Sequence, residues 1–267
     1  MEFIVNKDQF VKMQDNKIVG NPNLINSKIN FRGKNNILVC ANNIDLENVV
    51  LDFNGDNSIV YLSSELNDFF NLEIYNNSTF YLGKNTLIGN SIKIRIYESQ
   101  NVIIGDDCII EDEVFISTSD MYGIYDTNYK ERINYSNSIY IGDCVWLSFR
   151  SHVLRNVKIG SGTIINYNSV ISPGSKIKSN VYVSGNPAKI IRENVFFTKD
   201  PIASFKFDDS LNSKHYKSNI FIFELINLET LNLDKIEDIL KDLDVESRLE
   251  FIEKLFVRNK RKNRFTI

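Results

Sequence analysis

The sequence predicts an all-β solenoid with one protruding loop and a C-terminal α-helical extension. Three observations support this prediction. Branched aliphatic residues recur at every sixth position over residues 141–183, a polar insert at 117–138 interrupts the pattern, and the composition changes after Pro187. The chain of 267 residues is long enough to bury a substantial core. We divide it into an N-terminal cap (1–17), a solenoid domain (18–195) and a mostly helical extension (196–267).

The central repeat has a period of six residues. Its aliphatic positions are Ile141, Leu147, Val153, Ile159, Ile165, Ile171, Ile177 and Val183. The residues two places earlier are small or β-branched: Ile139, Val145, Ser151, Val157, Thr163, Ser169, Ser175 and Val181. This period fits neither an amphipathic helix nor a simple alternating strand. It predicts a three-sided coil in which each unit forms a short strand and a corner, with the aliphatic side chains inside and neighbouring coils stacked as parallel strands.

Earlier segments carry the same pattern less regularly. The step of six appears at Leu82, Ile88 and Ile94 and, after a slip, at Ile104, Ile110 and Ile116. Residues 36–62 alternate asparagine-rich turns with short β-branched runs, which predicts more irregular early coils.

The segment after the repeat is predicted to be helical. Residues 219–262 are expected to form two or three helices, one with Val245, Leu249, Ile252 and Phe256 on a single face and Asp244 as its N-cap. Two placements are open: the helices cover the solenoid's end, or they form a surface for a partner. We interpret the basic run RNKRKNR at 258–264 as a solvated terminus rather than a site for an anionic polymer or a membrane.

Composition excludes several classes of protein. No apolar run approaches the roughly 18 residues of a membrane span. The N-terminal MEFIVNKDQF lacks the apolar core of a signal peptide, so we expect a cytoplasmic protein. The net charge of −3 argues against a nucleic-acid partner. Cys40, Cys108 and Cys144 are widely spaced and odd in number, which indicates buried thiols rather than disulfides.

Several motifs then point to a known family. The chain resembles the left-handed β-helix (hexapeptide-repeat) acyltransferases in three features: the step of six, the sequence IGDCVWL at 141–147 and the sequence SGNPAKII at 184–191. The insert sequences SDMYGIYD at 119–126 and ERIN at 131–134 make the chain similar to those that O-acetylate bacterial capsular polysaccharide and sialic acid. This resemblance, which covers roughly residues 80–195, implies a left-handed parallel β-helix, acetyl-CoA as co-substrate without a metal, a carbohydrate acceptor, and a homotrimer with the donor in a groove between neighbouring solenoids.

The insert takes the place of the active-site loop of these enzymes. There the loop reads Asp-Met-His, and the histidine is the general base; here it reads Asp120, Met121, Tyr122. An imidazole titrates near a pH of about 6.5, whereas a phenol titrates near about 10 and is a poor proton acceptor at neutral pH. Three interpretations follow: the enzyme is slow or inactive, the tyrosine is an introduced replacement, or the chain is a binding protein.

The resemblance also assigns roles to other residues. Trp146, the single tryptophan, is predicted to face outward beside the donor groove, with Lys189 near the phosphates of the coenzyme. The alternative for Trp146 is packing against the loop or a neighbouring subunit.

The remaining predicted site residues lie in the loop. Asp120 joins Tyr122 and Trp146 as a catalytic candidate, with orientation of the loop as its usual role in the family. Asp126, Arg132 and Asn134 are the candidates for binding the acceptor, because an arginine suits a sugar carboxylate. An ion pair that anchors the loop is the alternative role for Arg132.

The two histidines of the chain are weak candidates for the missing base. His152 is predicted at a solvent-facing corner, too far from the loop within one subunit, and His215 in an exposed loop.

Three functions were weighed. The first is an acetyl-CoA-dependent O-acetyltransferase acting on a bacterial surface sugar, with activity weakened or abolished by Tyr122. The second is a non-catalytic β-helix protein that binds sugar or a protein partner. The third, a zinc carbonic anhydrase, needs three histidine ligands. Two histidines do not supply them, so this third function is excluded.

Overall fold

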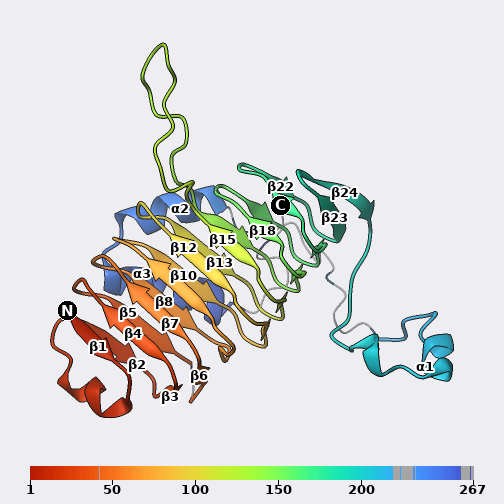
Figure 1. Ribbon diagram of the computed structural model, residues 1–267, viewed down its shortest axis with the longest axis horizontal. Coiled ribbons are helices and arrows are strands. Elements are labelled where there is room, and N and C mark those ends of the chain that lie inside the picture. The colour runs from red at the N-terminus through yellow and green to blue at the C-terminus, as the bar shows by residue number, and fades with distance from the viewer. Residues whose placement is uncertain (42, 219–222, 224–230, 232, 260–264, 266–267) are drawn as a thin grey trace.

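The structure is a computed structural model that describes residues 1–41, 43–218, 223, 231, 233–259 and 265. Its main body is a solenoid with three parallel sheets as its sides, and the helices nearest the C-terminus lie against it (Figure 1). The predicted fold class is confirmed. Only β1–β4 and β23–β24 pair antiparallel among the named strand pairs of the described chain, so the two ends of the solenoid are closed by reversals of the chain.

The three sheets are named here by number. Sheet 1 contains, in spatial order, β1 (Glu2–Ile4), β4 (Lys28–Phe31), β7 (Val50–Phe53), β9 (Asn71–Ile74), β12 (Lys93–Ile96), β15 (Phe115–Ser117), β18 (His152–Val153) and β21 (Val170–Ile171). Sheet 2 contains β2 (Lys17–Val19), β5 (Ile37–Cys40), β8 (Ile59–Leu62), β10 (Thr79–Leu82), β13 (Asn101–Ile104), β16 (Ile139–Ile141), β19 (Lys158–Ile159) and β22 (Lys176–Ile177). Sheet 3 contains β11 (Leu87–Ile88), β14 (Ile109–Ile110), β17 (Trp146–Leu147), β20 (Ile164–Ile165), β23 (Val181–Gly185) and β24 (Ala188–Glu193). A separate pair, β3 (Asn23–Ile25) and β6 (Asp45–Glu47), lies in the first coils.

The period of six is confirmed in the later coils. All eight predicted aliphatics from Ile141 to Val183 are buried, the most exposed being Ile177 at 8%. Hydrogen-bonded positions such as Asp143 and Ser161 are separated by 18 residues, one full coil. Each side of the coil contributes a two-residue ladder and a corner, which leaves room for one inward side chain per side.

The early coils are irregular in length, as predicted, and they are also longer than the later ones. Ile59 pairs with Thr79, 20 residues on, whereas Ile37 pairs with Ile59, 22 residues on. Strands β5 and β8 each have four residues, and Ile37–Cys40 pair with Ile59–Leu62 one for one. The slip before Ile104 therefore marks the change between long and short coils, and both kinds stack in register.

The later helices of the extension, from residue 233 onward, cover one side of the solenoid. The described part contains two 3-10 turns, η1 (Lys7–Lys12) and η2 (Ile202–Ser204), three α-helices, α1 (Phe207–Asn212), α2 (Leu233–Asp242) and α3 (Val245–Ile252), and the π-helical turn η3 (Glu253–Val257). Helices α2 and α3 lie on the outer face of sheet 2, not at the solenoid's end (Figure 1). Helix α1 stands apart from the solenoid and lies outside the predicted helical range.

Aromatic side chains of sheet 2 form the contact with these helices. Tyr81 stacks near Phe256 at 5.4 Å between ring centroids, and its hydroxyl donates to the Phe256 carbonyl at 3.3 Å. Lys158 of β19 is buried and forms an ion pair with Asp234 of α2. Strands β5, β8 and β10 are buried on both faces for this reason.

The predicted details of α3 are confirmed. The Asp244 carboxylate accepts a hydrogen bond from the Ser247 N–H at 2.8 Å, as an N-cap should. Val245, Ile252 and Phe256 are buried and Leu249 packs against them. The basic run at 258–264 lies largely outside the described residues, and no helix among those described is long and apolar enough to cross a bilayer.

Substituting Ile252 with valine should lower the free energy of unfolding by about 1 kcal/mol, because it removes one buried methylene from this contact. Ile252 is fully buried, whereas Ile239, in the same extension, is 44% exposed. Denaturant unfolding of Ile252→Val beside Ile239→Val measures the difference. Equal stability of the two variants would contradict the burial of α3 against sheet 2.

Candidate functional site

The insert forms a narrow arm between β15 and β16, at the corner where sheets 1 and 2 meet (Figure 1). At its base the Asn137 N–H donates to the Thr118 carbonyl at 3.1 Å. Further out, the Ile133 N–H donates to the Ile124 carbonyl at 2.9 Å, which closes the arm like a hairpin. The predicted boundaries of the insert therefore coincide with the ends of two strands, and a regular coil continues on either side.

Asp126 belongs to the tip of this arm. Its Oδ1 accepts from the backbone N–H groups of Asn128 and Tyr129 at 2.8 and 2.9 Å. This carboxylate therefore stabilises the tip turn, a role that aspartate often takes in turns.

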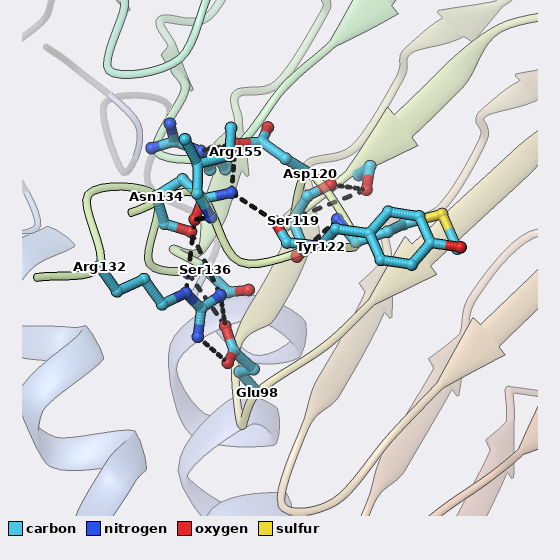
Figure 2. Close-up of polar contacts among 11 residues, drawn as sticks. Glu98, Ser119, Asp120, Tyr122, Arg132, Asn134, Ser136 and Arg155 are labelled. Atoms are coloured by element: carbon cyan, nitrogen blue, oxygen red, sulfur yellow. Dashed lines mark hydrogen bonds and ion pairs between the residues drawn. The ribbon is translucent and has the colours of Figure 1, made fainter. Parts of the chain in front are cut away.

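Asn134 and Asp120 join the two sides of the arm (Figure 2). The Asn134 amide is 1% exposed; it donates to Asp120 Oδ2 at 3.1 Å and to the Tyr122 carbonyl at 2.8 Å, and it accepts from the Ile124 N–H at 2.7 Å. Asp120 Oδ2 also accepts from Arg155 Nε at 2.9 Å. The two predicted residues thus hold the backbone on either side of Tyr122, with Arg155 tying them to the next coil.

Arg132 is bound to the body of the protein through Glu98. Its two terminal nitrogens donate to the two Glu98 oxygens, at 2.5 and 2.9 Å, in the paired geometry that arginine and carboxylates favour. The Ser136 N–H donates to the same carboxylate at 3.2 Å. The bond from Arg132 lowers the pKa of Glu98 to about 2. The guanidinium therefore anchors the arm in this structure, as the alternative from the sequence proposed.

Tyr122 is left free beside this cluster. Its side chain is 79% exposed, and Figure 2 shows the ring extending away from Asp120 and Asn134. Among the described residues no hydrogen bond to its hydroxyl is formed. The arm thus holds the backbone of residue 122 through Asn134 while its side chain points outward.

His152 lies inside a strand, not at a corner as predicted. In β18 it pairs with Phe115 of β15, and the two rings meet edge to face with centroids 5.7 Å apart. It is therefore on the strand next to the one that leads into the arm. His215 lies in a loop, as predicted, and is exposed.

Lowering the pH should weaken the ion pair between Arg132 and Glu98. Because the pKa of Glu98 is held near 2, below the value of about 4.3 expected in the unfolded chain, its pairing with Arg132 stabilises the fold fully above that value. This stabilisation is lost as the pH falls from about 4.3 through 2. We expect the melting temperature of wild type to exceed that of Glu98→Gln at neutral pH, with the gap closing in that window.

Thermal unfolding across a pH series measures this gap. Glu65→Gln, at an exposed carboxylate, is the matched control. If the difference in melting temperature between wild type and Glu98→Gln did not change with pH, the Glu98 carboxylate would not stabilise the fold through its charge.

Trp146 lines a pocket on sheet 3. The pocket has a volume of about 480 Å³, and its walls include Trp146, Ile164, Tyr182, Val195 and Phe196. The indole is half-buried on the outward face of β17, while its neighbour Leu147 is fully buried. Its ring also packs against Phe197, at 5.6 Å between centroids. The outward orientation agrees with the prediction, but the packing partner is Phe197 of the extension rather than the loop that the alternative named.

Lys189 lies on the same sheet as Trp146. It is exposed on β24, opposite Ser184 of β23. Strands β17, β20, β23 and β24 are neighbours in that order, so three strand spacings, about 14 Å, separate the strands of the two residues. Lys189 is also displaced along the sheet, since it lies opposite Ser184 whereas Trp146 is level with Tyr182. Within the described chain, no three His, Cys, Asp or Glu side chains are grouped so as to hold a metal ion.

The predicted residues therefore form two groups. The arm with Tyr122 leaves the corner between sheets 1 and 2, whereas Trp146 and Lys189 lie on sheet 3. In a three-sided solenoid the third side faces away from the corner formed by the other two. One chain by itself does not bring Tyr122 and Trp146 together.

The chain is similar in sequence and in structure to proteins named as polysialic acid O-acetyltransferases. The polysialic acid O-acetyltransferase of Neisseria meningitidis is 26% identical over 222 residues, which are 80% of this chain and 90% of that protein. The polysialic acid O-acetyltransferase of Escherichia coli O1:K1 is 30% identical over 139 residues, and the match covers only 44% of its length. The crystal structure of the polySia-specific acetyltransferase NeuO superposes with a TM-score of 0.64 and 29% identity, over 75% of this chain and 87% of that one.

The chain resembles the left-handed β-helix sugar O-acetyltransferases. This confirms the resemblance inferred from the repeat and the insert. No family model matches the sequence.

Three charged partners in the site were missed by sequence reasoning. Glu98 binds Arg132, Arg155 binds Asp120, and Glu111 accepts a hydrogen bond from the Trp146 indole. Each partner lies 34 or 35 residues from the residue it binds, because the insert lengthens this coil. Alignment of the coils by their aliphatics, Ile110 with Leu147, places Ile109 opposite Trp146 and Glu111 two residues further along on the same face, within reach of the indole.

Proposed function

We propose that this chain is an acetyl-CoA-dependent O-acetyltransferase that acts on a hydroxyl of a bacterial surface sugar, in the cytoplasm. The observation that carries the proposal is the similarity to NeuO, 29% identity at a TM-score of 0.64, over 75% of the chain. A shared fold alone would not support an activity, but a shared sequence over this length does.

The reaction would form an ester bond between the sugar oxygen and the acetyl carbon while the thioester C–S bond breaks. The sugar hydroxyl must lose its proton, and the departing coenzyme thiolate gains one. Residue 122 stands where the arm presents a side chain to the acceptor. A phenol there donates a hydrogen bond to the thioester carbonyl or to the acceptor, but it accepts a proton poorly at neutral pH. Transfer by this chain is therefore proposed to be slow.

The site is proposed to lie between subunits of a homotrimer. Since Tyr122 and Trp146 are on opposite parts of one chain, the arm of one subunit would meet the sheet 3 pocket of a neighbour. Helices α2 and α3 already cover sheet 2, so sheets 1 and 3 are the sides left for neighbours. Trp146 and Lys189 would contact the donor, Asp120, Arg132 and Asn134 would fix the arm, and Asp126 would shape the tip near the acceptor.

A second function is a sugar-binding protein without catalysis. The tyrosine at position 122 favours it, because it removes the usual base. Isothermal calorimetry with acetyl-CoA separates the two functions, since a binding protein has no need of the donor. Thiol release with sialic acid oligomers and capsular oligosaccharides as acceptors then identifies the sugar. The absence of acetyl-CoA binding by the full chain would contradict the transferase.

A further inference from the structure

Glu111 holds the indole of Trp146 in place. The Trp146 Nε1–H donates to one Glu111 oxygen at 3.0 Å, and the Phe149 N–H donates to the other at 2.8 Å. One carboxylate therefore joins the side chain at the start of β17 to the backbone just after it. Both of its oxygens are engaged, so it acts on the pocket through the orientation of Trp146.

A short segment of the extension packs on the same indole. We call residues Val195–Lys199 the strap. Phe197 of the strap is 7% exposed, and its ring lies against Trp146, with an interplanar angle of 53°. Burying this phenylalanine removes its apolar ring from water, which stabilises the strap against Trp146.

Both ends of the strap are fixed to the solenoid. The Val195 N–H donates to the Asn180 carbonyl at 3.0 Å, and Lys199 forms an ion pair with Asp107 at 3.4 Å. Asn180 and Asp107 are corner residues just before β23 and β14, three coils apart, a rise of about 14 Å. An extended strap of this length spans that rise, so it runs along the edge of sheet 3, back toward the N-terminal coils.

The strap supplies part of the pocket wall. Val195 and Phe196 face the strand residues Trp146, Ile164 and Tyr182 across it. The lining includes no lysine or arginine, and its carboxylate, Glu111, is already bound to Trp146. A pocket of this kind suits an uncharged, amide-containing chain better than a phosphate.

We propose that the strap and Glu111 complete the donor site, which would make the extension part of acetyl-CoA recognition. In this arrangement the uncharged pantetheine arm lies between the strap and sheet 3, and Glu111 and Phe197 are positioning residues that act through Trp146. The proposal rests on the proposed function, since it needs a chain that binds acetyl-CoA.

The single tryptophan allows a direct test. In the full-length chain we expect Phe197→Ala to raise the Kd for acetyl-CoA at least tenfold in calorimetry. The same substitution should shift Trp146 emission to the red and raise its quenching by acrylamide about twofold, because the indole becomes more exposed. Glu111→Gln should change emission in the same direction, since the two bonds go to different oxygens and the amide NH2 that replaces one of them cannot accept a hydrogen bond. Phe207→Ala, at a residue of the same extension that is 77% exposed, should change neither quantity.

Phe197→Leu keeps most of the apolar volume, so it tests the role of the strap if the alanine variant does not fold. We expect this variant to bind acetyl-CoA about threefold more weakly than wild type. If wild type binds acetyl-CoA and both Phe197 variants bind within twofold of it, the strap has no part in donor binding, while the proposed function stands. If wild type itself binds no acetyl-CoA, the proposed function fails and this inference fails with it.

Discussion

We expect Tyr122→His to raise the rate of acetyl transfer by roughly 10² to 10⁴, the contribution of a positioned general base. The arm already holds the backbone of residue 122 through Asn134 and presents its side chain outward, so an imidazole needs no rearrangement to reach an acceptor. The rate is measured as free thiol released from acetyl-CoA with a sialic acid oligomer as acceptor. It should rise with pH as the imidazole loses its proton near a pH of about 6.5.

Tyr129 offers a matched control for this substitution. It lies in the same arm and is also 79% exposed, but at the tip rather than beside Asp120 and Asn134. Tyr129→His should leave the rate unchanged. If Tyr122→His were no faster than wild type, residue 122 would not be the position of the base, and a search should turn to His152 on β18.

Removing the Asn134 amide should slow transfer by about 10²-fold when it is tested in the faster Tyr122→His background. The amide makes four hydrogen bonds within the arm, to Asp120, Tyr122, Ile124 and Arg132, and a shift of about 1 Å in a catalytic group costs this much. The measurement is steady-state kinetics of Asn134→Ala with kcat and KM determined separately.

Acetyl-CoA affinity distinguishes a loosened arm from a damaged fold. The Trp146 pocket is lined by residues of sheet 3, its adjoining corners and the strap, and the Asn134 amide forms its hydrogen bonds within the arm, so the Kd for acetyl-CoA should stay within twofold in Asn134→Ala. Asn128→Ala, at the tip of the arm, should keep the full rate. An unchanged rate in Asn134→Ala would mean that the arm does not need this cluster to place residue 122.

The solenoid was predictable because its pattern is local and repeated. When a branched aliphatic occupies every sixth position, a three-sided coil buries all of them. The repeat from Ile141 to Val183 therefore predicted which side chains are buried. The bounds of the arm followed too, since an interruption of a period shows where the chain leaves the coil. The N-cap at Asp244 was equally local.

The placement of the extension was not predicted, although a signal was present. The runs ILVC, IVYL and TFYL of β5, β8 and β10 are apolar at successive positions rather than alternate ones. Such strands are buried on both faces, which implies that something covers sheet 2. The early coils do not follow the step of six because their paired residues are 20 to 22 positions apart, which leaves longer corners between the strands.

Periodicity alone established the coil, its inward side chains and the point where the arm departs, since each depends on residues close together in the chain. The folded arrangement established which charges meet: Glu98 with Arg132, Arg155 with Asp120, and Glu111 with Trp146. It also separated the arm from the pocket on sheet 3 and laid the strap along Trp146. These contacts join residues from different coils, and a repeat has no local signal for which polar groups its neighbours will present.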